Sequence, residues 1–314
     1  MAVAAATLTA PPASQQPRSP SPYPALRGNW RAVTPFDECR AGLHRLPFRL
    51  KHDLTGHPLF GIDALLRVAS AAAKRSGDVY LDAGKAMINT KWGEMPGPDM
   101  PIEEIIRHIE HNDAWIVMKH IEVDPAYAEI LNEWADFMRE IAGDKAHLLL
   151  KPEMLVFITS PNRITPFHFD AEVGMLVQIQ GSKTLWICDP EDRSVVKETE
   201  LEHYYAVSIA AGNYTPYAET VATRIDLSPG DAAHIPGHAG HWVRNGNGIS
   251  VSLSLNFELP RRLRRDVYVA NHHIRRLGLT PRPPGQSAAA DRAKALAVAA
   301  ARQAKRAMRG AVRR

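Results

Sequence analysis

The chain has 314 residues, of which 45% are hydrophobic and 23% are charged, so it can bury the core of one large globular domain or two modest ones. Its two cysteines, Cys39 and Cys188, lie far apart, which argues against a cysteine-based zinc site, and the lack of any run of about 18 apolar residues argues against a transmembrane helix, so we expect a cytoplasmic protein. The net charge of +4 is unevenly divided, because residues 261–314 carry 15 Lys and Arg against 2 Asp and Glu, whereas residues 1–260 carry 23 against 32.

The first 145 residues divide into an N-terminal segment and a mixed region. Residues 1–28 are rich in Ala, Pro, Ser and Thr and lack the basic start and apolar run of a secretory signal, so we expect a disordered N-terminal segment. Residues 29–145 alternate helical and strand-like patterns, and we expect this region to pack on the core that follows. Its clearest pattern is a helix over residues 126–142, which Asp124-Pro125 opens and whose apolar residues recur at helical spacing.

Residues 146–260 have the pattern of a β core. Strand-like runs, divided by Gly, Pro, Asn and Asp, occupy residues 154–159, 165–170, 175–180, 184–188, 222–226, 232–235, 241–244 and 249–257. About eight such runs predict a double-stranded β-helix of the cupin or jelly-roll type. The predicted fold class is therefore mainly β with flanking helices (α+β), and residues 146–260 are the expected catalytic core.

Residues 261–314 form the basic C-terminal region, and we expect it to be helical. An Arg-rich stretch opens it at residues 261–265, and an Ala-rich run over 288–309 has high helix propensity. Such a tail suits an acidic surface on nucleic acid, on a protein or on a membrane. It equally suits the acidic core of the chain itself, and we favour a solvated helix resting on that core.

The segment Thr165-Pro166-Phe167-His168-Phe169-Asp170 carries the strongest chemical signal. In a strand, residues two apart point to the same face, so His168 and Asp170 project together while Phe169 points away. Imidazole nitrogen and carboxylate oxygen suit ferrous iron, and two histidines with one carboxylate form a facial triad that leaves metal positions open. We therefore predict a non-haem iron(II) oxygenase site.

The third ligand is expected in the segment that follows the turn Pro229-Gly230-Asp231. Three histidines, His234, His238 and His241, lie there within eight residues. We favour His241, because it opens the apolar strand-like segment that begins with Trp242 after a Gly-rich bend. His238 is the alternative, and His234 is expected to be a strand or rim residue.

Residues from about 150 to 258 resemble the JmjC branch of the cupin-like Fe(II)/2-oxoglutarate-dependent oxygenases. The similarity is greatest to the asparaginyl hydroxylase that inhibits hypoxia-inducible factor. The pieces that carry it, in order, are Thr165-Pro166-x-His168-x-Asp170, Gln178-Ile179-x-Gly181-x-Lys183, Pro229-Gly230-Asp231 with Ile235-Pro236 and His241, and the run 249–257. The resemblance implies that His168, Asp170 and His241 bind Fe(II), with 2-oxoglutarate and O2 as cosubstrates.

The resemblance also implies a cosubstrate site. Lys183 would pair with the distal carboxylate of 2-oxoglutarate, Thr165 would donate a hydrogen bond to the same carboxylate, and Asn256 would lie near the metal-bound end. A lysine in an otherwise apolar strand needs an anion, because a buried ammonium is costly without one. The chain departs from the compared hydroxylase at Gly174, where that enzyme has asparagine, and at Ala239-Gly240, where a bulky aromatic residue is common. Both changes are expected to reshape the pocket beside the metal.

The function implied by the resemblance is hydroxylation of a protein or peptide side chain, with succinate and CO2 as co-products. The alternatives are a small-molecule hydroxylase, an N-methyl-lysine demethylase, and a non-catalytic cupin that binds a ligand or partner. The sequence does not identify the substrate, and it leaves the oligomeric state open, with a homodimer compatible with it.

Overall fold

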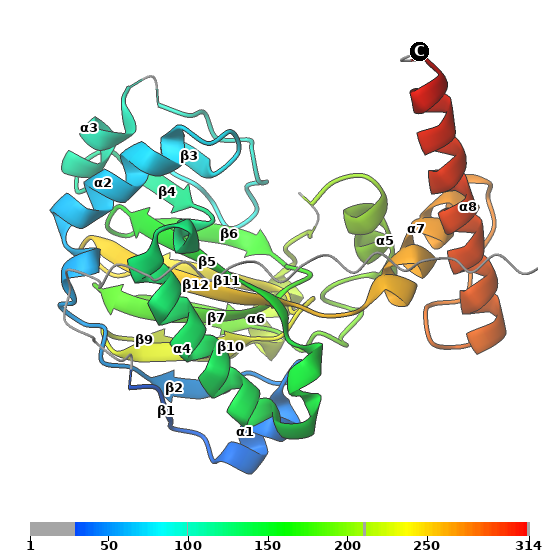
Figure 1. Cartoon of the computed structure of the whole chain (residues 1–314), viewed down its shortest axis with the longest axis horizontal. Helices are drawn as coiled ribbons and strands as arrows, with labels where there is room; N and C mark the ends of the chain where they lie inside the picture. Colours follow the sequence, from blue (N-terminus) through cyan, green and yellow to red (C-terminus); the bar gives the residue numbers. More distant parts are fainter. Residues whose placement is uncertain (1–28, 99, 210–211, 313–314) are drawn as a thin grey trace, which may run out of the picture.

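The computed structural model describes residues 29–98, 100–209 and 212–312, and two antiparallel β-sheets form the centre of this part of the chain (Figure 1). The N-terminal segment 1–28, for which we expected disorder, lies outside the described residues. The two sheets face each other as the double-stranded β-helix that the sequence predicts, and helices flank them. The predicted fold class is confirmed.

The larger sheet has the strand order β1-β2-β10-β7-β12-β5-β4-β3. Its strands are β1 (Arg31–Ala32), β2 (Arg49–Lys51), β3 (Val79–Ala83), β4 (Ala114–Met118), β5 (Leu150–Thr159), β7 (Val173–Gln180), β10 (Asp231–Ile235) and β12 (Ser250–Glu258). Strands from both sides of residue 146 therefore share one sheet. The division of the chain at residues 146 and 260 stays a prediction.

The smaller sheet has the order β6-β11-β8-β9. Its strands are β6 (Ile164–His168), β8 (Lys183–Ile187), β9 (Thr223–Leu227) and β11 (His241–Asn245). Between β8 and β9 the chain leaves the sheet and forms α5 (Glu198–Ala206) and α6 (Pro216–Val221). All eight strand-like runs predicted between residues 146 and 260 are strands, β5 to β12.

Helices from the N-terminal region cover the outer face of the larger sheet. They are α1 (Phe36–Gly42), α2 (Ile62–Ala73), α3 (Ile102–Arg107) and α4 (Pro125–Ala142), with the short 3-10 helices η1 (Pro58–Phe60), η2 (Ile121–Val123) and η3 (Gly143–Leu148). The main hydrophobic core lies here; Trp134 of α4, for example, stacks on Phe257 of β12 with ring centroids 4.6 Å apart. The sheet's inner face is thus free to carry polar groups.

The C-terminal region is a helix pair that stands beside the sheets (Figure 1). It consists of α7 (Arg262–Arg276) and α8 (Ala288–Val312), which pack on each other, while α7 also packs on α5. The predicted helix over 288–309 is therefore present. No helix in the described ranges is long and apolar enough to cross a bilayer.

Candidate active site

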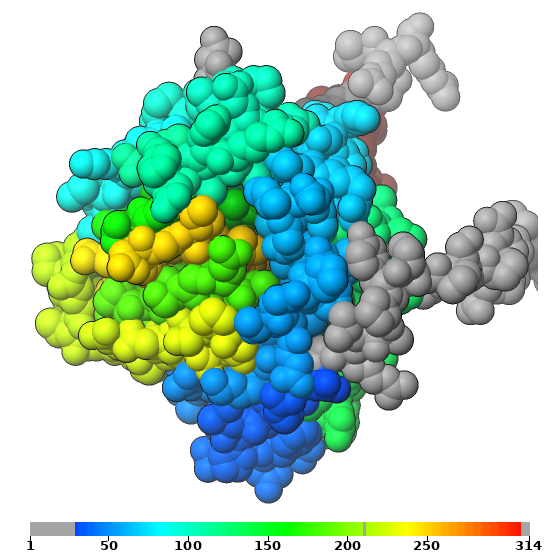
Figure 2. All heavy atoms as spheres, turned by 90° about the vertical axis from the view of Figure 1, so that its left-hand side faces the viewer, coloured from blue at the N-terminus to red at the C-terminus, as the bar shows by residue number. Residues whose placement is uncertain are grey.

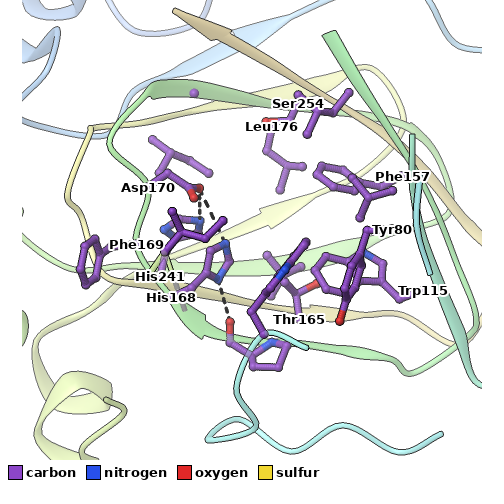
Figure 3. Close-up of a pocket in the computed structure, with 18 of the residues that line it drawn as sticks. Tyr80, Trp115, Phe157, Thr165, His168, Phe169, Asp170, Leu176, His241 and Ser254 are labelled. Carbon is purple, nitrogen blue, oxygen red and sulfur yellow. Dashed lines mark hydrogen bonds and ion pairs between the residues drawn. The ribbon is translucent and has the colours of Figure 1, made fainter. Parts of the chain in front are cut away.

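Three donor atoms from two neighbouring strands come together at one end of the smaller sheet. β6 ends at His168, Asp170 follows just beyond it, and β11 begins with His241, whose Cα is the ladder partner of His168. The Nε2 atoms of His168 and His241 each lie 3.8 Å from Oδ2 of Asp170 (Figure 3). All three donor atoms lie within 4.8 Å of one another, a spacing that one metal ion can bridge.

Backbone carbonyls fix which ring nitrogen of each histidine is available. Nδ1 of His168 lies 2.8 Å from the carbonyl oxygen of Pro166, and Nδ1 of His241 lies 2.9 Å from that of Ala239. A carbonyl oxygen only accepts, so each Nδ1 carries the proton and each Nε2 directs its lone pair toward the carboxylate of Asp170. Burial, together with the nearby His168, lowers the pKa of His241 to about 4, which keeps this imidazole neutral. Two neutral imidazoles and one carboxylate fit ferrous iron.

The other two candidate histidines have different partners. The backbone N–H of His238 donates to the carbonyl oxygen of Asp170 at 2.6 Å, and its Nε2 lies 2.6 Å from the hydroxyl oxygen of Tyr205 in α5. His238 adopts a left-handed backbone conformation with φ 69°. His234 is fully buried and stacks on Phe48 with ring centroids 4.3 Å apart. Of the three imidazole rings after the turn, the structure brings only that of His241 to the side chains of His168 and Asp170.

A cavity of about 320 Å³ lies between the sheets and contains the three donor atoms. The inner faces of the larger sheet's strands line it, because alternate residues of β12 point inward, Ser254 and Asn256, while Leu253 and Leu255 point into the main core. Aromatic side chains form the wall farther from the donors: Tyr80, Trp115 and Phe157 (Figure 3). Trp92, which also lines the cavity, packs on Tyr80. Tyr80 stacks on Trp92 with ring centroids 4.0 Å apart, and Trp115 stacks on Phe157 with ring centroids 6.3 Å apart.

Lys183, the first residue of β8, is a buried cation on the cavity wall. Its side chain donates from Nζ to Oγ of Ser252 at 2.8 Å and lies 5.7 Å from the ring centroid of Phe157. Only 5% of the residue is exposed, and none of the described carboxylates pairs with it. Burial lowers the pKa of its ammonium group to about 7. The charge therefore lacks a counterion in the protein, and a ligand carboxylate in the cavity would supply one.

Thr165 and Asn256, the other two predicted cosubstrate residues, also line the cavity. Asn256 is the ladder partner of both Glu153 and Gly174, so the three residues form a row across the sheet. A Cβ atom on Gly174 would lie 3.1 Å from Oδ1 of Asn256, so the glycine gives this amide its room. The glycine at position 174, where the compared hydroxylase has asparagine, therefore does shape the cavity.

Gly240 gives room to a second group of side chains. A Cβ atom there would lie 2.6 Å from Cζ of Phe167, which lines the cavity, and 3.2 Å from Cγ1 of Val195. The absent side chain lets β11 approach the outer hydrophobic cluster of Phe167 and Val195. The effect of Ala239-Gly240 on the shape of the pocket stays a prediction.

Two cavity carboxylates were not singled out from the sequence. Glu153 and Glu172 lie on the wall near Asn256 and Asp170, and burial raises the pKa of both carboxyl groups. The hydroxyl of Tyr204 accepts a hydrogen bond from the backbone N–H of Ala171 at 3.3 Å. The ring of Tyr204 packs on that of Phe169, which points away from the donors. No sequence pattern links Glu153 to the triad, because the fold alone brings β5 to it.

Comparisons with known proteins agree with this architecture. No curated protein matches the sequence. Among solved structures, an X-ray structure of Escherichia coli ycfD is similar with a TM-score of 0.52 and 15% identity, over 86% of this chain and 67% of that one. Another, described as YcfD, a ribosomal oxygenase from E. coli in complex with cobalt and 2-oxoglutarate, has a TM-score of 0.46 and 15% identity over the same shares.

The ycfD structure with a TM-score of 0.52 shows a shared fold, and the alignment covers about two thirds of its length. The sequence itself matches the profile of the cupin-like domain over residues 94–261, which is more than half of the chain. That range includes every proposed metal and cosubstrate residue. The chain therefore belongs to the family of cupin-like domain proteins.

Proposed function

We propose that this protein is an Fe(II)- and 2-oxoglutarate-dependent dioxygenase that hydroxylates a protein or peptide side chain. The observation that carries the proposal is the presence, in one cavity, of a convergent His168–Asp170–His241 donor set and of the uncompensated cation Lys183. A binding barrel has no use for both features together. A dicarboxylate cosubstrate of a ferrous site uses both of them.

The roles of the residues follow from their positions. Nε2 of His168, Nε2 of His241 and the carboxylate of Asp170 would hold iron, and the carbonyls that fix each Nδ1 would keep the rings oriented. Lys183 would pair with the distal carboxylate of 2-oxoglutarate. Thr165 would donate its hydroxyl hydrogen bond to the same carboxylate.

When bound, ferrous iron and 2-oxoglutarate supply the redox chemistry, in which one oxygen atom of O2 enters a substrate C–H bond and the other enters succinate as CO2 is released. The protein's own residues orient the cosubstrate and exclude water. The apolar side chains of Leu176, Phe157 and Val243 line the space between Lys183 and the donor set. They would keep the distal ion pair dry, which strengthens it.

A protein or peptide substrate is preferred over a small molecule because of the similarity to YcfD. YcfD is described as a ribosomal oxygenase, and its structures include complexes with cobalt and 2-oxoglutarate or succinic acid. The shared fold makes a macromolecular substrate the first class to test here. Demethylation of N-methyl-lysine would release formaldehyde, and hydroxylation would not.

The test is iron-dependent conversion of 2-oxoglutarate to succinate, with mass spectrometry of candidate peptides for the gain of one oxygen atom. We expect His168→Ala and Asp170→Ala to abolish succinate formation and to weaken Co(II) binding, followed by its visible absorption. Lys183→Met should keep Co(II) binding but lose 2-oxoglutarate binding, because it removes the cation and keeps most of the side chain's volume.

The matched control is His111→Ala, which removes a histidine whose side chain is 79% exposed and remote from the cavity lining. It should leave metal binding and turnover unchanged. Persistence of succinate formation in both His168→Ala and Asp170→Ala would refute the proposed centre. Release of formaldehyde from a methylated peptide would replace hydroxylation with demethylation.

A further inference from the structure

The surface of the C-terminal helix pair is cationic. Residues 261–314 contain only two acidic residues, and both are buried. Asp266 pairs with Arg302 at 2.6 Å, and Asp291 accepts a hydrogen bond from the backbone N–H of Gly285 at 2.7 Å. No carboxylate side chain is therefore exposed on this part of the protein to neutralise its basic residues.

One face of α7 gathers basic side chains into a stripe. Arg262, Arg265 and Arg276 are exposed, and their spacing of three and eleven residues places them on one side of the helix. His272 and His273 lie on the same side, between Arg265 and Arg276. We call these five residues the α7 stripe. None of its arginines makes an ion pair with another described residue.

The position of α7 gives the stripe its relation to the cavity. The side of the helix next to the stripe is buried against α5, where Tyr268 stacks on Tyr205 with ring centroids 5.6 Å apart, and His272 at the edge of the stripe lies 6.2 Å from His203 of α5 between ring centroids. Tyr204, the neighbour of Tyr205, lines the cavity. The stripe is thus one helix away from the cavity wall, on the side of the molecule where α5, α7 and α8 stand together in Figure 1.

The chemistry of the α7 stripe fits a phosphodiester backbone. Guanidinium groups bind phosphate in a bidentate manner, and about 21 Å separates the ends of the stripe, at a rise of about 1.5 Å per residue over 14 residues. Exposed basic residues of α8 and of the connection before it add positive charge to the helix pair: Arg282, Arg292, Lys305 and Arg306. A multivalent anion of comparable length is therefore the matching partner.

Two features distinguish among such anions. A membrane-surface helix inserts an apolar face into the bilayer, whereas Val267 and Ala270 of α7 are already packed within the protein and only Leu263 among the large apolar side chains of this helix is exposed. The imidazoles of His272 and His273 offer both a donor and an acceptor when neutral, which suits a ribose 2′-hydroxyl. Burial, with the nearby His273 and His203, lowers the pKa of His272, which favours the neutral ring.

We propose that the α7 stripe is an RNA-binding surface that contacts the phosphate backbone and ribose hydroxyls and holds RNA beside α5, the helix whose Tyr204 lines the cavity. RNA binding does not require the proposed oxygenase activity. If the protein has the proposed oxygenase activity, bound RNA would bring an RNA-associated protein substrate to the cavity.

The experiment is fluorescence anisotropy of the full chain with a labelled single-stranded RNA of about 20 nucleotides, longer than the roughly 4–16 nucleotides of a typical single-strand site. The variant Arg262→Gln/Arg265→Gln/Arg276→Gln should bind about tenfold or more weakly. The slope of log affinity against log salt should flatten by about 2, since each single-strand phosphate contact contributes about 0.7. Thermal melting followed by circular dichroism checks that the variant folds.

The matched control is Arg67→Gln/Lys74→Gln/Arg107→Gln, which removes three exposed charges from α2 and α3 and the residue after α2. It should keep the RNA affinity and the salt slope of the unmodified protein. Equal RNA binding by the α7 variant and the unmodified protein would overturn the proposal. So would equal affinity for DNA of the same sequence, or stripe-dependent binding to phosphatidylserine vesicles without binding to RNA.

Discussion

At the scale of single residues, Lys183 and Ser252 form a polar pair inside the cavity. The ammonium group donates to the serine hydroxyl, but burial still lowers the pKa of Lys183 to about 7. A carboxylate bound beside the ammonium would raise that pKa again, because an opposite charge favours the protonated form. Cosubstrate binding and protonation of Lys183 are therefore expected to be linked.

We predict that 2-oxoglutarate binds more weakly as the pH rises above about 7. Below that pH the free protein already carries the proton on Lys183, whereas above it binding must take up a proton, so affinity should fall up to about tenfold per pH unit. Isothermal titration calorimetry between pH 6 and 9, roughly the range around this pKa, in buffers of different ionisation enthalpy would measure both the affinity and the proton uptake.

The conservative variant Lys183→Arg provides the control for this linkage. A guanidinium group stays protonated throughout that range, so whatever affinity the variant retains should not depend on pH through this residue. A dissociation constant that stays flat above pH 7 in the unmodified protein would contradict the linkage.

At the scale of elements, β12 separates the two environments of the larger sheet. Leu253 is fully buried in the main core, and its neighbour Ser252 is fully buried on the opposite face, where it contacts Lys183. One strand thus contributes to stability with one face and to the cavity with the other. Adjacent residues can test the two contributions separately.

We predict that Leu253→Ala lowers the free energy of unfolding by about 2–5 kcal/mol, because it leaves a cavity in a packed core. Ser252→Ala should cost about 1 kcal/mol, the net value of a typical hydrogen bond, but should change 2-oxoglutarate affinity. Urea denaturation and cosubstrate titration of both variants would show the difference. Equal losses of stability in the two variants would show that the faces are not independent.

The elements differ in how well the sequence predicts them. The strands β5 to β12 are predictable, because turn residues divide them and their own patterns indicate strands. The strands β1 and β2 are not, because they have two and three residues and are stabilised by pairing with each other and with β10, far away in the sequence. Similarly, the spacing of His168 and Asp170 predicts a metal site, whereas the contact between His238 and Tyr205 depends on where α5 packs.

At the scale of the whole molecule, buried neutral histidines connect the N-terminal region to the β core. His52 lies next to the backbone carbonyl of Gln178, with Nε2 3.1 Å from the oxygen, and His234 lies between Gly174 and His44. Burial lowers the pKa of His52 to about 4 and that of His234 to about 3. Both rings are therefore neutral in the folded protein at neutral pH.

We predict that the protein loses stability as the pH falls from about 6.5 to about 4. Histidines of the unfolded chain take up protons near pH 6.5, roughly their unperturbed pKa, while these two buried rings stay neutral until about pH 4 or below. Each of these two histidines would lower the free energy of unfolding by up to about 3 kcal/mol over that pH interval. Urea midpoints measured at several values of pH would reveal the loss.

A variant of an exposed histidine serves as the comparison for the acid effect. His111→Gln should show the same decline as the unmodified protein, because its side chain is 79% exposed. His52→Gln should show a smaller decline, since one buried titrating group is gone. Constant stability between pH 6.5 and 4.5, about the span between the two states' titrations, would contradict this origin of acid sensitivity.

The composition of the eight-stranded sheet also has a practical consequence. The family match begins at residue 94, after β1, β2 and β3. A fragment cut there would lack β2 beside β10 and β3 beside β4, so two rows of backbone amides and carbonyls would lose their partners. Exposed edge strands of this kind pair with strands of other molecules. Expression of residues 94–261 alone is therefore expected to yield aggregates. The sequence from residue 29 onward is needed, because it supplies the strands that pair with β10 and β4.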